Sequence, residues 1–334
     1  MKRTFLVIRF SALGDVALSV PVLKHVTAHN PNAHFIVVSD IKWGDLFDGI
    51  DRVGFQGFDL KKKHSGILGI FSIYWFLLRN YQFEAVVDLH SVIRTHILRA
   101  LFILSGKQVA SVDKGRSEKA IITREKNKKL YQLLHTTERY LKVFEHFGLT
   151  VNRQLLTDDL IKVKKNISTT KKLGFAPFAR HALKMYPIES MEQVIRYFDK
   201  EGFELYFFGK GSSERNLINE WGKKFQHAIS MNDTLSLSEE LAIISTLDLM
   251  VTMDSANMHL ASNVEVPVVS IWGPTHPFIG FYGFRQDPSN AVQVDLSCRP
   301  CSVYGNKQCW RGDHACIQEI KPVDIISKIE NLLH

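Results

Sequence analysis

The chain has 334 residues, of which 45% are hydrophobic, and a formal net charge of +8. This length supports a large core and suggests two domains. No stretch reaches the roughly 20 apolar residues that a membrane-spanning helix needs. Arg9 interrupts the first apolar run too early for a signal peptide. We therefore expect a cytoplasmic protein.

The positive charge is concentrated in the first half of the chain. Residues 1–150 hold 22 Lys and Arg against 13 Asp and Glu, whereas the remainder holds 20 against 21. A basic half indicates an anionic partner, such as a phosphorylated substrate, a membrane surface or a nucleic acid. The alternative is that the extra lysines only keep the protein soluble.

Apolar runs typical of strands alternate with helical patterns along the first half. Strands are predicted at residues 4–10, 34–39, 52–55, 85–89 and 108–112, and helices at 17–29, 93–104 and 128–147, with Gly148 as the stop signal of the last helix. This βαβ order predicts a parallel sheet with helices on both faces.

The same pattern restarts after a polar segment. Strands are predicted at 172–177, 203–208, 248–252 and 266–272, and helices at 188–200, 213–225, 236–245 and 256–263. The sequence thus predicts an α/β protein with two Rossmann-like, doubly wound domains whose parallel sheets face across a cleft. The domains are 1–150 and 172–321, joined by a linker and edge element at 151–171 and followed by a C-terminal helix at 322–334. Ligands of such sheets bind at the carboxyl ends of the strands.

A carboxylate follows the first strand, in the stretch RFSALGDVALSVP. Ser11 and Gly14 form the turn, and Asp15 lies where the helix is expected to begin. No G-x-G-x-x-G motif is present, so the dinucleotide fingerprint is missing. Asp15 is therefore either an N-terminal cap of the helix or a general base that accepts a proton from a hydroxyl group.

The second half carries a counterpart, VTMDSANMHLASNVEVPVVSIWGPT. The small residues Ser255, Ala256 and Asn257 open a helix and leave backbone amides for a diphosphate. Asp254 suits sugar hydroxyls, or it caps the helix. His259 is expected to be a buried structural histidine. The turn from Gly273 to Thr275 ends the next strand at the same edge of the sheet.

Four motifs together resemble the ADP-heptose:lipopolysaccharide heptosyltransferase family, inverting glycosyltransferases of the GT-B fold. They are LVIRFSALGDVALSVPVLK, FAPFARHALKMYP, FFGKGSSE and MDSANMHLASNVEVPVVSIWGPTHP, in the family's order and spacing over nearly the whole chain. The resemblance implies a nucleoside-diphosphate sugar donor, ADP-heptose above all, and an anionic glycolipid acceptor such as the lipopolysaccharide core.

The resemblance also implies roles for individual residues. Asp15 matches the general base, with Ser11 and Gly14 in its loop, and Lys184 matches a lysine that contacts the diphosphate. Glu214 matches the acid on the ribose, and Leu235 matches the contact to the base. Asp254 matches the residue that holds the donor sugar, and Ser255 with Ala256 matches the diphosphate-binding amides.

The sequence departs from the family at Ala12, at Ala256, which stands in place of a glycine, and at His276, which stands in place of an aspartate. Taken alone, Lys184 and Glu214 could simply be solvated. Because no D-x-D pair stands at a strand end, we expect catalysis without a required metal.

All four cysteines cluster near the C-terminus, as Cys298, Cys301, Cys309 and Cys316. Four such ligands could hold a structural zinc, or they could be four reduced thiols, since structural disulfides are rare in the cytoplasm. We expect this segment to lie far from the other motifs and to fasten a loop.

A basic cluster, Lys61 to Lys63, precedes the apolar stretch at residues 67–78. This stretch is either a helix that covers the sheet or one that docks on the inner membrane leaflet. A second basic patch lies at residues 114–129. We expect no nucleic-acid partner, because nucleic-acid binding would leave Lys184, Glu214 and Asp254 unexplained. An NAD-dependent oxidoreductase and a non-catalytic sugar-binding protein are the alternatives.

Overall fold

The computed structural model describes residues 2–152, 160–163, 170–229, 231 and 234–333. The chain forms two compact units: unit 1 is Met1–Gly115 with Thr136–Leu156, and unit 2 is Arg116–His135 with Thr157–His334. The predicted linker at 151–171 lies largely outside the described residues. Within the described part, no helix is long and apolar enough to cross a membrane.

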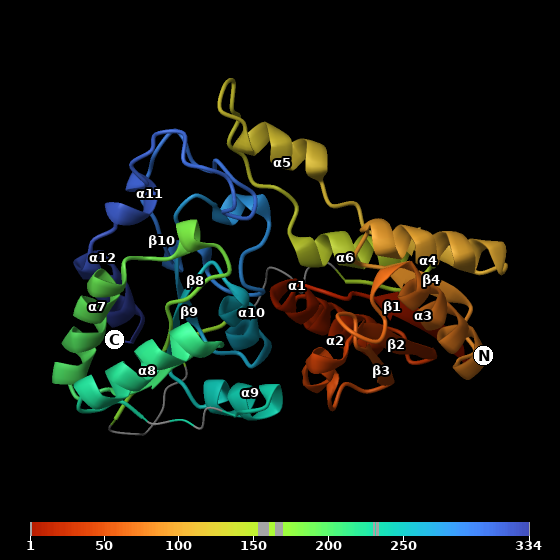
Figure 1. Ribbon diagram of the computed structural model, residues 1–334, viewed down its shortest axis with the longest axis horizontal. Helices are drawn as coiled ribbons and strands as arrows, with labels where there is room; N and C mark the ends of the chain where they lie inside the picture. Colours follow the sequence, from red (N-terminus) through yellow and green to blue (C-terminus); the bar gives the residue numbers. More distant parts are fainter. Residues whose placement is uncertain (1, 153–159, 164–169, 230, 232–233, 334) are drawn as a thin grey trace. The chain divides into compact units, whose positions relative to one another are not determined.

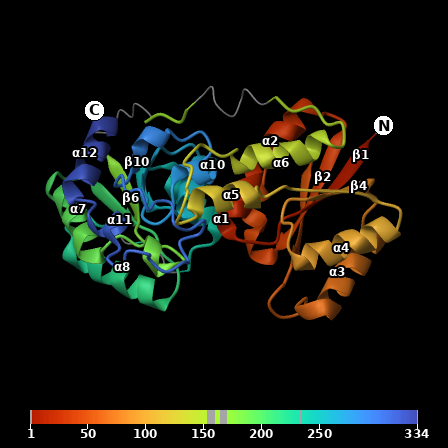
Figure 2. The ribbon, with the colours of Figure 1, turned by 90° about the horizontal axis from the view of Figure 1, so that it is seen from above.

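Unit 1 is built on a five-stranded parallel sheet in the order β3-β2-β1-β4-β5 (Figure 1). Its strands are β1 (Arg3–Ile8), β2 (Ala33–Asp40), β3 (Val53–Phe58), β4 (Ala85–Asp88) and β5 (Gln108–Ser111). Its helices are α1 (Leu13–Ala17), α2 (Ser19–His29), the 3-10 helix η1 (Ile41–Phe47), α3 (Gly66–Asn80), α4 (Ile93–Leu104) and α6 (Thr136–Glu145). Figure 2 shows α3 and α4 on one face of this sheet and α2 and α6 on the other.

The continuous apolar runs of unit 1 follow from this layering. Strand β1 is buried on both faces. Leu6 and Ile8 belong to the core cluster that α3 and α4 close, and Phe5 stacks on Phe35 with ring centroids 5.6 Å apart. A parallel strand covered on both faces has no polar side to present, so its sequence does not alternate.

Unit 2 repeats the plan with the strand order β10-β9-β8-β6-β7, again parallel. Its strands are β6 (Lys172–Ala176), β7 (Glu204–Phe207), β8 (Leu249–Met253), β9 (Val268–Ile271) and β10 (Ala291–Val292). Its helices are α5 (Arg116–Thr123), η3 (Ala182–Lys184), α7 (Ile188–Lys200), α8 (Ser212–Lys224), α9 (Leu237–Ser245), α10 (Ala256–Asn263), η4 (Pro277–Ile279), η5 (Pro288–Asn290), α11 (Ala315–Gln318) and α12 (Pro322–Leu333). The C-terminal helix α12 belongs to this unit, because Ile325 and Ile329 enter the core that α7 also lines.

All nine predicted strands are present, with ends shifted by up to three residues, and the α/β fold class is confirmed. The short edge strand β10 was not predicted. The helix predicted at 17–29 is interrupted at Leu18, so that α1 and α2 are separate helices.

The predicted helix at 128–147 is wrong in its first part. Helix α6 begins only at Thr136, and α5 with the segment after it belongs to unit 2. Tertiary contacts override the helical pattern there. The Leu133 N–H donates to the Phe278 carbonyl at 2.9 Å, and Ile122 and Leu133 pack on Ile279. Residues 116–135 carry six Lys and Arg against two Asp and Glu, so part of the basic excess assigned to the first domain belongs to unit 2.

Candidate active site

Asp15 lies in the first turn of α1, beyond the carboxyl end of β1. The N-cap of this helix is Ala12, which makes no side-chain cap hydrogen bond, so the capping interpretation of Asp15 is wrong. The Asp15 carboxylate instead forms an ion pair with the guanidinium of Arg9, and 30% of the Asp15 side chain is exposed. Arg9 itself is buried and donates to the Leu89 carbonyl at 2.6 Å. The carboxylate is thus held in one orientation and remains reachable by a hydroxyl group.

The ends of two neighbouring strands form the surroundings of Asp15. His90 follows β4, which pairs with β1, and its ring lies edge-on to Phe10 with centroids 6.0 Å apart. Burial, and then the charges of Arg9, Lys114 and Arg94, lower the pKa of His90 to about 2. A neutral imidazole therefore stands near the cations at this edge. Arg9 and His90 were not predicted as site residues. His90 directly follows the strand predicted at 85–89, whereas Arg9 lay inside the strand predicted at 4–10, and β1 ends before it, at Ile8.

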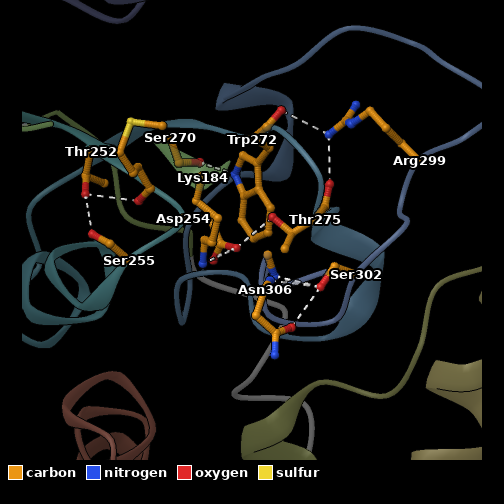
Figure 3. A network of polar contacts seen from close by, with 12 residues as sticks. Lys184, Thr252, Asp254, Ser255, Ser270, Trp272, Thr275, Arg299, Ser302 and Asn306 are labelled. Atoms are coloured by element: carbon orange, nitrogen blue, oxygen red, sulfur yellow. Dashed lines mark hydrogen bonds and ion pairs between the residues drawn. The ribbon is translucent and has the colours of Figure 1, made fainter. Parts of the chain in front are cut away.

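Three of the predicted donor residues of unit 2, Lys184, Asp254 and Thr275, contact one another (Figure 3). Asp254 is nearly buried, and its Oδ2 atom accepts a hydrogen bond from Thr275 Oγ1 at 2.7 Å. The same oxygen lies 2.6 Å from Nζ of Lys184. Residues from η3, from the end of β8 and from the turn after β9 thus meet, as their strand-end positions predict.

The start of α10 lies directly beside this network. Ser255 is the N-cap residue, but its side chain makes no cap hydrogen bond; its hydroxyl instead lies 3.1 Å from that of Thr252. Ala256 and Asn257 form the first turn. Because the first backbone amides of a helix have no intrahelical partner, this end favours an anion. His259 is buried one turn further on, as predicted.

The turn from Gly273 to Thr275 is fixed by a residue that the sequence analysis did not single out, Arg299. Its buried guanidinium donates to the carbonyls of Gly273 (2.6 Å), Trp272 (3.1 Å) and Thr275 (3.0 Å). Burial lowers the pKa of Arg299, and the nearby Cys316, Cys298 and Asp295 offset only part of this shift. The spacing in sequence gives no signal for these contacts, because 24 to 27 residues separate the partners.

The cysteine segment therefore does not lie far from the other motifs, and that prediction is wrong. The Cys301 N–H donates to the Pro274 carbonyl at 3.0 Å. Gly305 packs against the stem of Lys184: a Cβ atom at Gly305 would lie 2.3 Å from Lys184 Cγ. Ser302 Oγ accepts from the Gly305 N–H at 2.9 Å and holds this approach in place.

The four thiols are free, with Cys301 and Cys316 buried and Cys298 and Cys309 partly buried. Burial raises the pKa of Cys316 to about 11, and burial with the charges of Cys298 and Cys309 raises the pKa of Cys301. Among the described residues, no group of three or more His, Cys, Asp or Glu side chains is arranged to hold a metal ion.

Leu235 and Glu214 lie at the carboxyl end of β7. Leu235 lines a small pocket whose walls combine apolar side chains, among them Phe207 and Ile218, with the cations Lys210 and Arg215. The Glu214 carboxylate accepts a hydrogen bond from the Lys210 N–H at 2.7 Å. A residue that was not predicted completes this pocket: Glu240 is buried, lines the pocket and pairs with Lys210 Nζ at 2.6 Å.

Comparison with known proteins identifies the family. Residues 74–310 match the model of glycosyltransferase family 9 (heptosyltransferase). The chain is 23% identical to lipooligosaccharide heptosyltransferase 2 of Campylobacter jejuni, with 96% of each chain covered. It is similar in fold to a family 9 glycosyltransferase from Veillonella parvula (TM-score 0.76, 20% identity, covering 100% of this chain and 98% of that one). It is also similar to the E. coli heptosyltransferase WaaC with ADP-2-deoxy-2-fluoro heptose (TM-score 0.69, 14% identity, 99% and 100% covered).

The two parallel α/β units match the GT-B fold of solved heptosyltransferases. The chain belongs to glycosyltransferase family 9, the heptosyltransferases. The resemblance stated from the motifs is thereby confirmed. The roles of the individual residues stay predictions.

The neutral His90 predicts a specific loss of stability in acid. The native state does not protonate His90 until about pH 2, whereas the unfolded chain protonates it below its ordinary value near 6.5. The free energy of unfolding should therefore fall as the pH drops below 6.5, by about 2 kcal/mol at pH 5 from this group. In urea unfolding at pH 7 and pH 5, His90→Gln should lose about that much less than the wild type. The exposed His96 provides the control, and equal losses in His90→Gln and His96→Gln would contradict the assignment.

Proposed function

We propose that this protein transfers heptose from ADP-heptose to an anionic acceptor of the lipopolysaccharide-core type, with inversion at the anomeric carbon. Family membership supports heptosyl transfer. The C. jejuni relative is named for lipooligosaccharide, and WaaC is described with an ADP-heptose analogue. The observation that carries the proposal is the network of Lys184, Asp254 and Thr275 beside the start of α10. A cytoplasmic location stays a prediction.

In the proposed reaction, the acceptor hydroxyl oxygen attacks the anomeric carbon, and the Asp15 carboxylate takes the hydroxyl proton. The bond from the anomeric carbon to the β-phosphate oxygen breaks, and its electron pair leaves with ADP. The Lys184 ammonium and the backbone amides of Ser255 and Ala256 would receive the negative charge that grows on the diphosphate. The step is written without a metal ion, as the sequence predicts.

Each donor residue is proposed to contact a different part of the nucleotide sugar. One of the three N–H groups of Lys184 is directed at the buried carboxylate of Asp254, and the two groups form an ion pair. Asp254 would accept from sugar hydroxyls, because a carboxylate repels phosphate. The pocket of Leu235 would take the base, with Glu214 toward the ribose. Because the chain belongs to a glycosyltransferase family, the two alternatives, an NAD-dependent oxidoreductase and a non-catalytic sugar-binding protein, are not supported.

The donor site is tested by calorimetric titration with ADP and ADP-heptose. Lys184→Ala should weaken ADP binding by about 10- to 100-fold, because a charge-assisted contact to the diphosphate is lost. Gly305→Ala should also weaken it, because the added methyl group displaces the Lys184 stem.

Gly312→Ala is the matched control. Gly312 has a positive φ like Gly305 and lies in the same segment, but no atom lies within 4 Å of the position of its Cβ. It should therefore bear the same backbone strain without moving Lys184. Wild-type ADP affinity in Lys184→Ala would show that the diphosphate binds elsewhere. Equal losses in the two glycine variants would assign the effect to backbone strain.

The role of Asp15 is tested with Asp15→Asn, which keeps the shape of the side chain but cannot accept the proton. Turnover should fall by about 10²- to 10⁴-fold while ADP affinity stays near wild type. The melting temperature should fall, because the buried Arg9 loses its charged partner. Steady-state kinetics with calorimetry separates these effects. Wild-type turnover in the Asn variant would remove Asp15 as the base.

Metal analysis of the purified protein distinguishes a structural zinc from four reduced thiols in the cysteine segment. A structural zinc stays a prediction that rests on the donor set alone, four thiols of one short segment. If the thiols bind zinc, the purified protein should contain about one metal ion per chain, and chelation should lower its melting temperature. Four titratable thiols in a metal-free, active protein would establish the reduced-thiol alternative.

A further inference from the structure

Helices α3 and α4 of unit 1 each have two different faces. Their inner faces cover the sheet: Ile73 and Leu77 of α3 and Phe102 of α4 are fully buried in one cluster. Tyr74 joins the two helices, because its ring lies 5.3 Å from that of Phe102 and its hydroxyl contacts Ser105. The prediction of a sheet-covering helix at 67–78 is therefore correct for this inner face.

The outer faces of the same two helices are apolar and exposed. Within the described residues, sixteen large hydrophobic side chains are exposed, and eight of them belong to α3 and α4. They are Ile67 (64%), Leu68 (85%), Phe71 (40%), Trp75 (53%) and Phe76 (38%) on α3, and Ile93 (80%), Ile103 (58%) and Leu104 (84%) on α4. The positions on α3 follow a helical period of three to four, so they form one stripe. Such a concentration marks an interaction surface rather than scattered exposure.

The charge around this surface is mostly positive. The sequence holds no Asp or Glu from Leu60 to Phe83, and none from Leu89 to Val112. The three lysines Lys61, Lys62 and Lys63 stand exposed immediately before α3. At the other end of the helix, the guanidinium of Arg79 lies 5.8 Å from the ring centroid of Trp75. An apolar stripe bordered by cations is complementary to an anionic lipid surface, which offers hydrocarbon below a layer of negative headgroups.

We propose that the α3–α4 face of unit 1 docks on an anionic lipid leaflet. Leu68, Trp75 and their apolar neighbours enter the headgroup boundary, and Lys61, Lys62 and Lys63 contact the lipid phosphates. Helix α3 has 15 residues, about 22 Å at the standard rise, so it can lie on a bilayer but cannot cross its hydrocarbon core of about 30 Å. A second copy of this chain is the less suitable occupant, because two such faces would bring mostly like charges together, with Asp59 as the one carboxylate beside the lysines.

The experiment is vesicle flotation of the purified full chain, without nucleotide sugar or acceptor. Wild-type protein should float with vesicles of phosphatidylcholine mixed with phosphatidylglycerol, and much less with phosphatidylcholine alone. Leu68→Glu with Trp75→Glu should lower the partition coefficient at least about tenfold, because two apolar contacts become charges that repel the lipid. Lys61→Gln, Lys62→Gln and Lys63→Gln together should lower it by about 100-fold, roughly fivefold for each lysine.

Matched controls come from exposed residues of unit 2. Leu130→Glu with Val323→Glu changes two exposed apolar side chains, and Lys200→Gln, Lys223→Gln and Lys307→Gln together remove three exposed lysines. Both sets should bind vesicles like the wild type, and all variants should keep the wild-type melting temperature.

Unchanged flotation of the Leu68 and Trp75 variant would overturn the proposal. So would sedimentation of the wild type as a dimer that this variant dissociates. Since no substrate is present, a negative flotation result says nothing against the proposed transferase activity. Loss of the transferase proposal would likewise leave the flotation result standing.

Discussion

The donor side of this protein depends on one buried guanidinium. Arg299 donates to three carbonyls of the turn after β9, which places Thr275 against Asp254 and, through it, Lys184. A planar group with five donors in a fixed geometry suits several converging carbonyls better than a lysine would. Without it, buried carbonyl oxygens would lack partners, at a cost of about 1–3 kcal/mol for each. The position of the turn is therefore set by burial and hydrogen bonding together.

The segment that contains Arg299 consequently has an architectural role at the site. It contacts Pro274 through Cys301 and the stem of Lys184 through Gly305. Lys128 binds the same segment from the other side, donating to the carbonyls of Cys298 and Pro300. Because these contacts reach both the turn and the lysine, any chemistry that orders the four thiols also acts on the geometry of the donor site. The segment holds the turn after β9 and the stem of Lys184, so it is part of the donor site.

The sequence predicts the parts of this structure that depend on local pattern and strand order. Buried strands and the carboxyl edges at which Asp15, Asp254 and Thr275 lie follow from apolar runs and turn residues. Lys184 and Asp254 are 70 positions apart in the sequence, yet the resemblance of their motifs to the family predicts both at one site. Arg299 and Glu240 could not be found in this way, because a side chain that reaches a distant turn or pocket leaves no periodic signal. The helix wrongly extended over 128–135 failed for the same reason, since contacts with Phe278 and Ile279 decide its conformation.

Within unit 1, Asp15 and the start of α4 lie at the same edge of the sheet. Helix α4 begins at Ile93, just after His90 and the carboxyl end of β4, and Ile93 is 80% exposed. Asp15 follows the neighbouring strand β1 at the same edge, because β1 and β4 are parallel and paired. A lipid surface against the start of α4 would therefore lie beside the edge that carries the proposed base. The proposed docking face and the proposed base thus lie toward the same edge of one sheet, which relates the basic charge, the exposed apolar side chains and the position of the carboxylate within unit 1.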